Sequence, residues 1–301
     1  MNQGKIVVIG SMSMDLVVTS PKRPLAGETV IGEELHIVPG GKGANQAVAA
    51  RRAGAEVEMV GAVGNDQFGR MVRENFRKEG VSITHLKQLP GTSTGTAHIV
   101  LAEGDNSIVI VQGANKEVTP EQVEEASELL LSASIVLMQL EIPLETVCYA
   151  ANLCKQHNIP VILNPAPANA LPPSLIEQVT FLTPNEHECR TLFGEQAEVE
   201  AILRKYPNKL ILTEGEKGVR YFDGEKISRI PALSVKVTDT TGAGDTFNGV
   251  LAVALAKGLS LEEAIRHACA AASLSVTKLG AQGGMPAWDE IKKALQSRNE
   301  I

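Results

Sequence analysis

The sequence predicts an α/β protein with a doubly wound, mainly parallel sheet flanked by helices and a small accessory β-sheet attached as a lid. Short runs rich in Val, Ile and Leu alternate with helical patterns through most of the chain, as in βα units. These runs are almost continuously apolar, which indicates strands buried on both faces. Residues 15–38 and 95–111 interrupt the alternation and have no helical pattern. We therefore expect one domain, residues 1–301, with a lid inserted from these two segments.

The strands expected in the main sheet are short and end near a glycine or a polar residue. In chain order they are residues 5–10, 56–63, 135–139, 161–164, 181–183 and 210–213. The expected helices have apolar residues at intervals of three and four. They are residues 43–53, 68–79, 120–131, 144–157 and 185–193, and, in a helical region after residue 228, residues 244–257, 261–278 and 288–296. Two alternating runs around Gly104 predict a β-hairpin in the lid.

Composition and charge exclude several classes of function. No run approaches the roughly 18 apolar residues that cross a bilayer, so we expect no membrane partner. The first residues show no signal-peptide pattern, which favours a cytoplasmic protein with reduced cysteines. The net charge is −7 and there is no basic tract, so we expect no nucleic-acid partner and a small ligand instead.

The run from Thr240 to Asp245, Thr-Thr-Gly-Ala-Gly-Asp, comes just before an apolar helix. Backbone N–H groups of Gly242, Ala243 and Gly244 at a helix start suit a phosphate, because the first turn has unpaired donors and a partial positive charge. Asp245 has two interpretations. It could cap the helix, since Asp is a preferred capping residue. Alternatively, beside phosphate-binding groups it could take the proton from an alcohol that attacks a phosphoryl group.

The segment from Thr240 to Gly249 resembles, nearly residue for residue, the C-terminal signature of the ribokinase (PfkB-type) family of carbohydrate kinases. The run Pro39-Gly-Gly-Lys-Gly-Ala-Asn-Gln-Ala resembles the N-terminal signature of the same family. Further motifs follow in the family order, so the resemblance covers essentially the whole chain. It implies an ATP-dependent sugar kinase with Asp245 as general base, assisted by Gly242, Ala243 and Gly244. By itself the glycine run at Lys42 could be a surface turn, and it is no Walker A motif.

On the sugar side, polar groups at strand ends and on a glycine turn suit the vicinal hydroxyls of a sugar, which both donate and accept hydrogen bonds. The residues that the resemblance implies are Ser13, Asp15, Gly41, Lys42, Gly43, Asn45, Glu141 and Asp245. Ser13 stands where the family commonly has Asn, and its shorter side chain leaves the effect on one sugar contact open. For Glu141 the alternative is a solvated carboxylate in a turn.

On the nucleotide side, the resemblance implies ATP-binding residues at glycine-containing turns and a helix start. They are Asn185, Thr213, Gly215, Gly218, Gly244 and Cys269. Asn185 and Glu188 match an Asn-x-x-Glu motif placed near Mg²⁺, which they would hold through water. Alone, this motif would more often cap a helix. Cys269 falls where a polar residue beside the adenine is common.

The resemblance also implies a site for a monovalent cation, K⁺. The matching residues are Asp239, Thr241, Ser275, Lys278, Gly280 and Gly284. Several would act through backbone carbonyls, and Lys278 could act only in that way because its ammonium group cannot bind a cation. Asp239 could equally be a turn residue.

Within the family, the glycine run at Lys42, the segment Leu163-Asn-Pro-Ala-Pro-Ala and the triplet Gly280-Ala-Gln favour D-ribose, phosphorylated at its 5-hydroxyl. Fructose, deoxyribose, adenosine and ketodeoxygluconate remain alternative acceptors, and a non-catalytic sugar- or nucleotide-binding protein is a further alternative. A dinucleotide-binding fold is disfavoured, because Gly10-Ser-Met-Ser-Met-Asp15 does not match Gly-x-Gly-x-x-Gly. The exposed edge of a small lid sheet predicts a homodimer.

Overall fold

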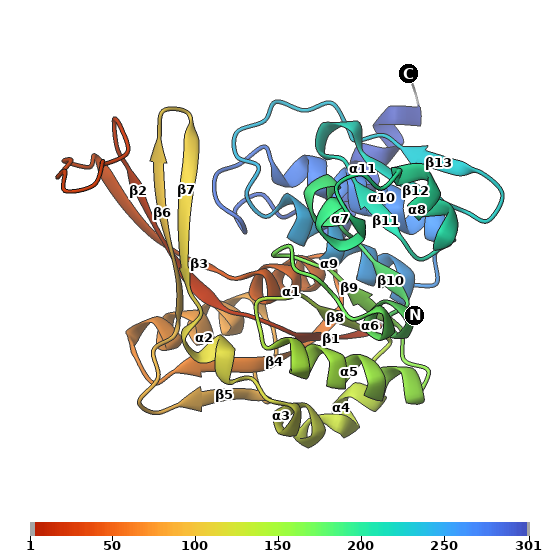
Figure 1. Ribbon diagram of the computed structural model, residues 1–301, viewed down its shortest axis with the longest axis horizontal. Helices are drawn as coiled ribbons and strands as arrows, with labels where there is room; N and C mark the ends of the chain where they lie inside the picture. Colours follow the sequence, from red (N-terminus) through yellow and green to blue (C-terminus); the bar gives the residue numbers. More distant parts are fainter. Residues whose placement is uncertain (1–3, 300–301) are drawn as a thin grey trace.

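The computed structural model describes residues 4–299, and its main feature is a six-stranded sheet (Figure 1). All five neighbouring pairs of strands in this sheet are parallel. In spatial order the strands are β10 (Phe181–Leu182), β9 (Val161–Leu163), β8 (Ile135–Met138), β1 (Lys5–Ile9), β4 (Glu56–Gly64) and β5 (Leu86–Leu89). The predicted fold class is confirmed.

Helices cover both faces of the sheet, and β1 shows why its sequence is continuously apolar. Ile6 and Val8 belong to one buried cluster, whereas Val7 and Ile9 belong to the other. The first cluster packs against α1 (Lys42–Arg52), α2 (Gln67–Glu79), α9 (Ala243–Ala256), α10 (Leu261–Ser275) and α11 (Trp288–Asn299). The second packs against α3 (Pro120–Glu125), α4 (Ser127–Leu131), α5 (Leu144–Gln156), α6 (Pro173–Gln178), α7 (Glu186–Phe193) and α8 (Val199–Lys205).

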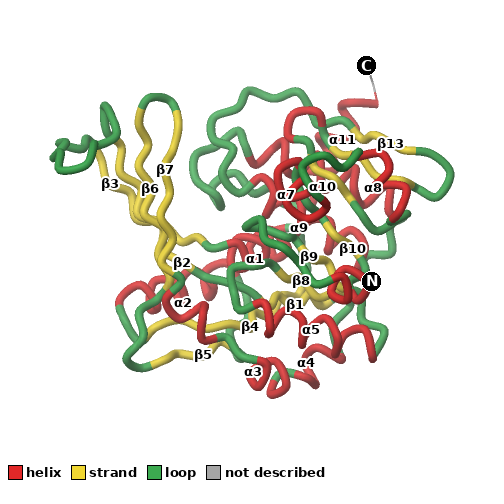
Figure 2. The backbone as a smooth tube through the Cα atoms, viewed as in Figure 1, coloured by secondary structure: helices red, strands yellow, loops and turns green. Residues whose placement is uncertain are grey.

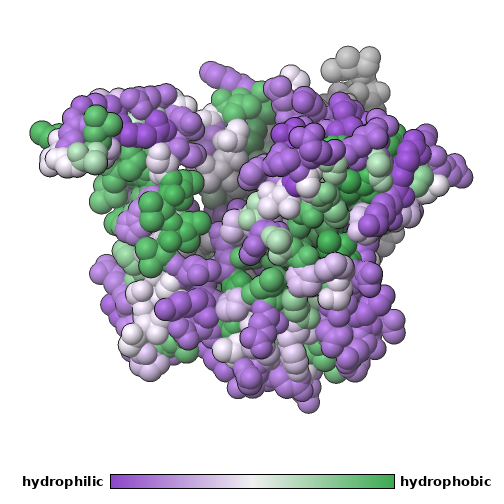
Figure 3. Space-filling model, in the orientation of Figure 1, coloured by the Kyte–Doolittle hydropathy of each residue, from purple (hydrophilic) through white to green (hydrophobic). Residues whose placement is uncertain are grey.

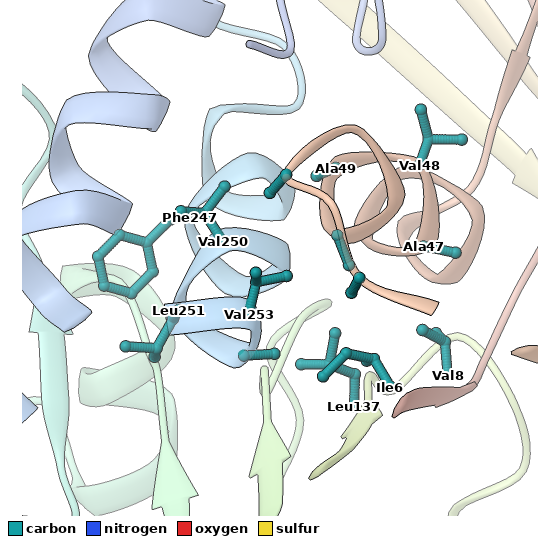
Figure 4. Close-up of a cluster of buried hydrophobic side chains, with 14 of the residues drawn as sticks. Ile6, Val8, Ala47, Val48, Ala49, Leu137, Phe247, Val250, Leu251 and Val253 are labelled. Carbon is teal, nitrogen blue, oxygen red and sulfur yellow. The ribbon is translucent and has the colours of Figure 1, made fainter. Parts of the chain in front are cut away.

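The packing of α9 against α1 positions the functional site. Figure 4 shows Phe247 and Val250 of α9 in the same buried cluster as Ala47 and Ala49 of α1. A Cβ atom on Gly249 would lie 2.7 Å from the Gln46 carbonyl oxygen, so only glycine permits this approach of the two helices. The N-terminal turns of α9 and α1 are therefore neighbours.

Beyond β10 the chain adds a three-stranded antiparallel sheet, which the sequence did not predict as such. It consists of β11 (Ile211–Thr213), β12 (Val219–Phe222) and β13 (Ile227–Ile230). Single parallel bridges from Leu182 to Leu210 and from Asn185 to Thr213 connect it to the edge of the main sheet. We expected a helical region after residue 228. This was wrong for residues 229 and 230, which belong to strand β13.

Other differences concern short elements. The helix expected at 120–131 is divided into α3 and α4 at Ala126, and β5, α6 and α8 were not expected. The helix expected to reach residue 278 ends at Ser275, because the Val276 carbonyl accepts hydrogen bonds from the N–H groups of Thr238 and Asp239. No helix within residues 4–299 is long and apolar enough to span a membrane.

A separate four-stranded sheet projects from the main body (Figures 1 and 2). Its spatial order is β3 (Glu34–Gly40), β2 (Ser13–Thr19), β6 (Gly95–Ala102) and β7 (Asp105–Val111). The central pair β2 and β6 is parallel, and both outer pairs are antiparallel. The root of this sheet is the part where β2 begins at Ser13 and β6 begins at Gly95. It lies at the ends of β1 and β4, so residues at the start of β2 lie beside the main sheet.

Candidate active site

Asp245 lies in the first turn of α9 but does not cap it. The N-cap residue is Gly242, with a φ of 77°, and a Cβ atom there would lie 2.5 Å from the Ala281 carbonyl oxygen. The capping interpretation of Asp245 was wrong, because the Asp245 carboxylate turns toward α1 instead. The Ala243 N–H donates to the Thr240 carbonyl over 3.3 Å, and an added Cβ on Gly244 would meet only open space. The Gly244 backbone is therefore accessible to a ligand.

The carboxylate of Asp245 is held by two side-chain amides of α1. Asn45 Nδ2 donates to Oδ2 over 2.9 Å, and Gln46 Nε2 donates to Oδ1 over 3.1 Å. Burial raises the pKa of Asp245 above its usual range, because it disfavours the charged form. The Lys42 ammonium and the two amides oppose this effect. A buried carboxylate with a raised pKa and fixed orientation is suited to accept a proton.

Lys42 is the cation that faces the buried carboxylates of the site. Burial alone would lower its pKa, but the negative charges of Asp245, Glu141, Glu188 and Asp15 outweigh burial and raise it. The ammonium group therefore stays charged at neutral pH. Its charge compensates carboxylates that would otherwise repel one another.

On the predicted sugar side, the structure brings the glycine turn and the end of β1 into contact. A Cβ atom on Gly43 would lie 2.6 Å from the Ser11 nitrogen, and one on Gly41 would lie 2.8 Å from the Ser13 nitrogen. Glu141 accepts hydrogen bonds from the Ser11 hydroxyl and from the Lys42 N–H. Glu141 is thus bonded to both segments, and the interpretation as a solvated turn carboxylate was wrong.

Asp15 occupies the same region, at the root of the projecting sheet. Its side chain is 8% exposed, and the Ser13 hydroxyl donates to Oδ1 over 3.1 Å. Burial is the main cause that raises the pKa of Asp15 to about 6; the Ser13 hydrogen bond opposes the rise, and Glu141 and Asp245 add to it. Ser13 therefore acts on Asp15, and no sequence pattern predicts this contact.

The nucleotide side is a cleft of about 1010 Å³ between α9, α10 and the β11–β12 turn. All six residues predicted to bind ATP line it: Asn185, Thr213, Gly215, Gly218, Gly244 and Cys269. Gly218 has a φ of 90°, and a Cβ there would lie 2.1 Å from the Ile230 carbonyl oxygen. Lys42 and Asp245 also line the cleft, so it is continuous with the sugar side. An apolar wall that includes Leu233, Val235 and Val237 was missed, because an irregular loop has no periodic sequence signal.

Asn185 and Glu188 form a capping box at the start of α7. The Glu188 N–H donates to Asn185 Oδ1 over 2.8 Å, and the Asn185 N–H donates to a Glu188 carboxylate oxygen over 2.9 Å. Both still line the cleft. Burial raises the pKa of Glu188, opposed by the Asn185 hydrogen bond and the Lys42 charge. Within residues 4–299 no group of three or more His, Cys, Asp or Glu side chains could hold a metal, so a Mg²⁺ ion here would need phosphate and water ligands.

The residues of the predicted cation site lie on two adjoining loops and at the last residue of α10, Ser275. Asp239 accepts hydrogen bonds from the N–H groups of Thr241 over 2.9 Å and Gly280 over 2.7 Å. Burial alone would raise the pKa of Asp239, but these bonds outweigh it and lower the pKa. Gly284 packs directly on the Ser275 carbonyl, with an added Cβ only 1.9 Å from that oxygen. Lys278 is exposed on the same loop. An ionised carboxylate beside backbone carbonyls fits a monovalent cation.

The sequence did not predict a network of buried and half-buried side-chain amides around Asp245. Gln46 Nε2 also donates to Asn164 Oδ1 over 3.2 Å, and Gln139 Nε2 donates to Gln46 Oε1 over 2.7 Å. Gln282 Nε2 donates to Asn45 Oδ1 over 3.0 Å. One sequence signal could have indicated these contacts. The four residues not predicted, Gln46, Gln139, Asn164 and Gln282, all occur inside or next to motifs that were already identified.

The fold, the cleft and the buried carboxylate define a carbohydrate kinase, and comparison with known proteins agrees. The model of the pfkB family of carbohydrate kinases matches residues 3–288, so the chain belongs to this family. Among its relatives, the ribokinase of Bacillus subtilis is 55% identical over 96% of this chain and 99% of its own. The deoxyribokinase of Salmonella typhi is 38% identical, covering 98% and 99%.

The structural comparison points to the same enzymes. The structure of Arabidopsis thaliana ribokinase complexed with ribose and ATP matches with a TM-score of 0.90. It is 33% identical, and the match covers 97% of this chain and 99% of that one.

Proposed function

We propose that this protein transfers the γ-phosphoryl group of ATP to the 5-hydroxyl of D-ribose, giving D-ribose 5-phosphate and ADP. The observation that carries the proposal is the position of Asp245. It lines the same cleft as all the residues expected to bind ATP, and it interacts electrostatically with Asp15, Lys42 and Glu141 on the sugar side. The close similarity to ribokinases supports ribose as the acceptor.

In the proposed mechanism, Asp245 accepts the proton of the attacking hydroxyl as the oxygen bonds to the γ-phosphorus. The Lys42 charge and the N–H groups at the start of α9, above all that of Gly244, balance negative charge on the transferred oxygens. Gly242 places this turn, and the long Ala243 hydrogen bond leaves that N–H able to turn toward a phosphate. Asp15, Asn45 and Glu141 orient the sugar, with Gly41 and Gly43 allowing close approach.

Two ions complete the proposal. Mg²⁺ bound to the phosphates would reduce their charge, with Glu188 and Asn185 bonded to its water ligands. K⁺ would be held by Asp239 and Thr241 together with carbonyl groups of the facing loop, namely those of Ser275, Lys278, Gly280 and Gly284. A cytoplasmic location stays a prediction from the sequence.

An acceptor panel tests the proposed function. ADP release is measured with ribose, 2-deoxyribose, fructose, adenosine and ketodeoxygluconate, each with and without Mg²⁺ and K⁺. We expect ribose to give the highest kcat/KM, with no turnover in the absence of Mg²⁺ and slower turnover in the absence of K⁺. A clear preference for 2-deoxyribose would instead favour the second candidate, which the deoxyribokinase relative supports. No turnover with any acceptor would contradict the kinase proposal.

The raised pKa of Asp15 predicts that ribose binding depends on pH. The ionised carboxylate accepts sugar hydroxyls, so binding should be full well above pH 6 and weaken as the pH falls through about 6. For a single proton, the Kd for ribose should be about tenfold higher at pH 5 than at pH 8. Calorimetric titration measures this Kd without turnover. Asp15→Asn should bind weakly with little pH dependence; the same pH dependence in this variant would exclude Asp15 as its source.

We further propose that the four-stranded sheet is a lid inserted in a single domain. Asp15 lies at its root, paired with the buried Ala97 of β6, so movement of the sheet would cover a sugar bound at Asp15. Covering the sugar would exclude water, which otherwise competes as the phosphoryl acceptor.

The lid also supports the proposal of a homodimer. Its outer strands β3 and β7 are sheet edges and carry exposed apolar side chains at Leu35, Ile37, Ile108, Val109, Ile110 and Val111. Figure 3 shows hydrophobic surface gathered on this projection. Contiguous exposed apolar surface on a strand edge favours pairing with a second copy.

Light scattering after gel filtration tests the dimer. We expect twice the chain mass of 32.0 kDa for the wild type, and a monomer for the double variant Val109→Asp and Val111→Asp, because charges would face the apposed sheet. Leu131→Asp, an equally exposed apolar position on α4, should leave the mass unchanged. A monomeric wild type would contradict the proposal.

A further inference from the structure

We propose that Gln46 is a positioning residue of the kinase, which fixes the plane of the Asp245 carboxylate and favours its ionised form, and that Gln139 fixes the orientation of Gln46. The inference rests on the proposed function, in which Asp245 is the base. Gln46 touches neither the nucleotide cleft nor open solvent, since its side chain is fully buried and is not among the residues that line the cleft.

The contacts of Gln46 use both of its N–H groups. The nitrogen Nε2 lies 3.1 Å from Asp245 Oδ1 and 3.2 Å from Asn164 Oδ1, so each acceptor can receive one of its two hydrogens. Asn45 donates to the opposite oxygen of Asp245, so each carboxylate oxygen receives one amide donor. Two donors in fixed positions restrict the Asp245 carboxylate to one plane. Each carboxylate oxygen still has a free lone pair that can accept the proton of the sugar hydroxyl.

The polarity of this network is fixed by Asp245. An ionised carboxylate has no proton to donate, so Gln46 must present its nitrogen to Asp245 and its oxygen to Gln139. Gln139 must then present its nitrogen to Gln46 Oε1, over 2.7 Å. The resulting chain of donors runs from Gln139 through Gln46 to Asp245.

Gln139 keeps this orientation at a cost. Its Oε1 is the one buried side-chain nitrogen or oxygen atom among residues 4–299 that has no hydrogen-bond partner. It lies against Gly10, where a Cβ atom would come within 2.1 Å of it. Rotation of the Gln139 amide by about 180° would instead place its oxygen against Gln46 Oε1, so the bond to Gln46 determines this orientation.

The chemical consequence is a lower pKa of Asp245 than burial alone would give. Both amides bond to the ionised form, and the Gln46 bond is one of the interactions that oppose burial. Loss of this donor should raise the pKa of Asp245. The base would then be protonated over more of the acidic range, and the acid limb of the rate profile would move to higher pH.

The test compares Gln46→Met, which keeps length and apolar volume but removes both donors, with the wild type. Single-turnover phosphorylation of ribose at saturating ATP is measured from pH 5 to 9, together with the Kd for ribose and the melting temperature. We expect the acid limb to move up by about one pH unit, as for the loss of one hydrogen bond to a charged group. On the acid side of the limb the rate should fall by about tenfold, while the Kd for ribose changes little.

Gln122→Met is the matched control, because Gln122 is also a buried amide with two acceptors, the carbonyls of Gly61 and His85, far from Asp245 in the fold. It should lower the melting temperature without moving the pH profile. A Gln46→Met profile that coincides with the wild-type profile would overturn the inference, even if Asp245→Asn is inactive. If wild type fails to phosphorylate any acceptor, the proposed function itself fails.

Discussion

Replacement of Asp245 by Asn should lower kcat for ribose phosphorylation by at least about 100-fold, the low end for a positioned general base. The side chain keeps its size and one acceptor oxygen, but it can no longer take the hydroxyl proton. Loss of activity should persist at every pH, because an amide does not titrate. ATP binding should be largely retained, since the first-turn N–H groups of α9 do not depend on the side chain of residue 245.

Three measurements separate this effect from damage to the fold. Steady-state kinetics gives kcat, titration with a non-hydrolysable ATP analogue gives the nucleotide Kd, and thermal unfolding gives the melting temperature. The variant should melt close to the wild type, because it loses hydrogen bonds to Asn45 or Gln46 but also loses a buried charge. Turnover within tenfold of the wild-type value would exclude Asp245 as the base.

Replacement of Lys42 by Met should have the second largest effect. Four carboxylates would then face one another without the cation, so the pKa values of Asp15 and Asp245 should rise further. Loss of a nearby opposite charge shifts a carboxyl pKa by about 1 to 3 units, which predicts a fall in kcat/KM of about 10- to 1000-fold on the acid side of the rate profile and a smaller fall near neutral pH.

The pH dependence distinguishes this variant from Asp245→Asn. As the pH rises toward 9, the carboxylates of Lys42→Met ionise again and part of the activity should return. Lys87→Met removes an exposed lysine that pairs with Glu125 on the surface, and it should behave as the wild type. A Lys42→Met profile that is parallel to the wild-type profile at all pH values would show that the charge of Lys42 does not control these carboxylates.

The fold class could be predicted because continuous apolar runs and helical periods are local signals. The apolar run from Ile6 to Ile9 predicts a strand buried on both faces. The structure confirms this, because alternate side chains of the run belong to the two buried clusters. The strands of the β11–β12–β13 sheet could not be predicted in the same way. They are three or four residues long, and their pairing depends on contacts with distant parts of the chain.

The site could be predicted only at the level of motifs. Glycines such as Gly43 and Gly242 identify places where backbones approach, but not which side chains meet there. That Asp245 is bonded to Asn45 and Gln46, 200 and 199 residues away respectively, follows from the packing of α9 on α1 at Gly249. The orientation of Gln139 and the effect of Ser13 on Asp15 depend on such tertiary contacts, which have no sequence pattern.

The product of the reaction tests the central proposal most directly. Wild-type protein is incubated with ATP, Mg²⁺, K⁺ and D-ribose, and phosphorus and carbon NMR spectra identify the phosphorylated position. We expect ribose 5-phosphate and an equal amount of ADP. Absence of phosphorylated ribose, or a product phosphorylated at another hydroxyl, would contradict the assignment of this site as a ribose 5-kinase.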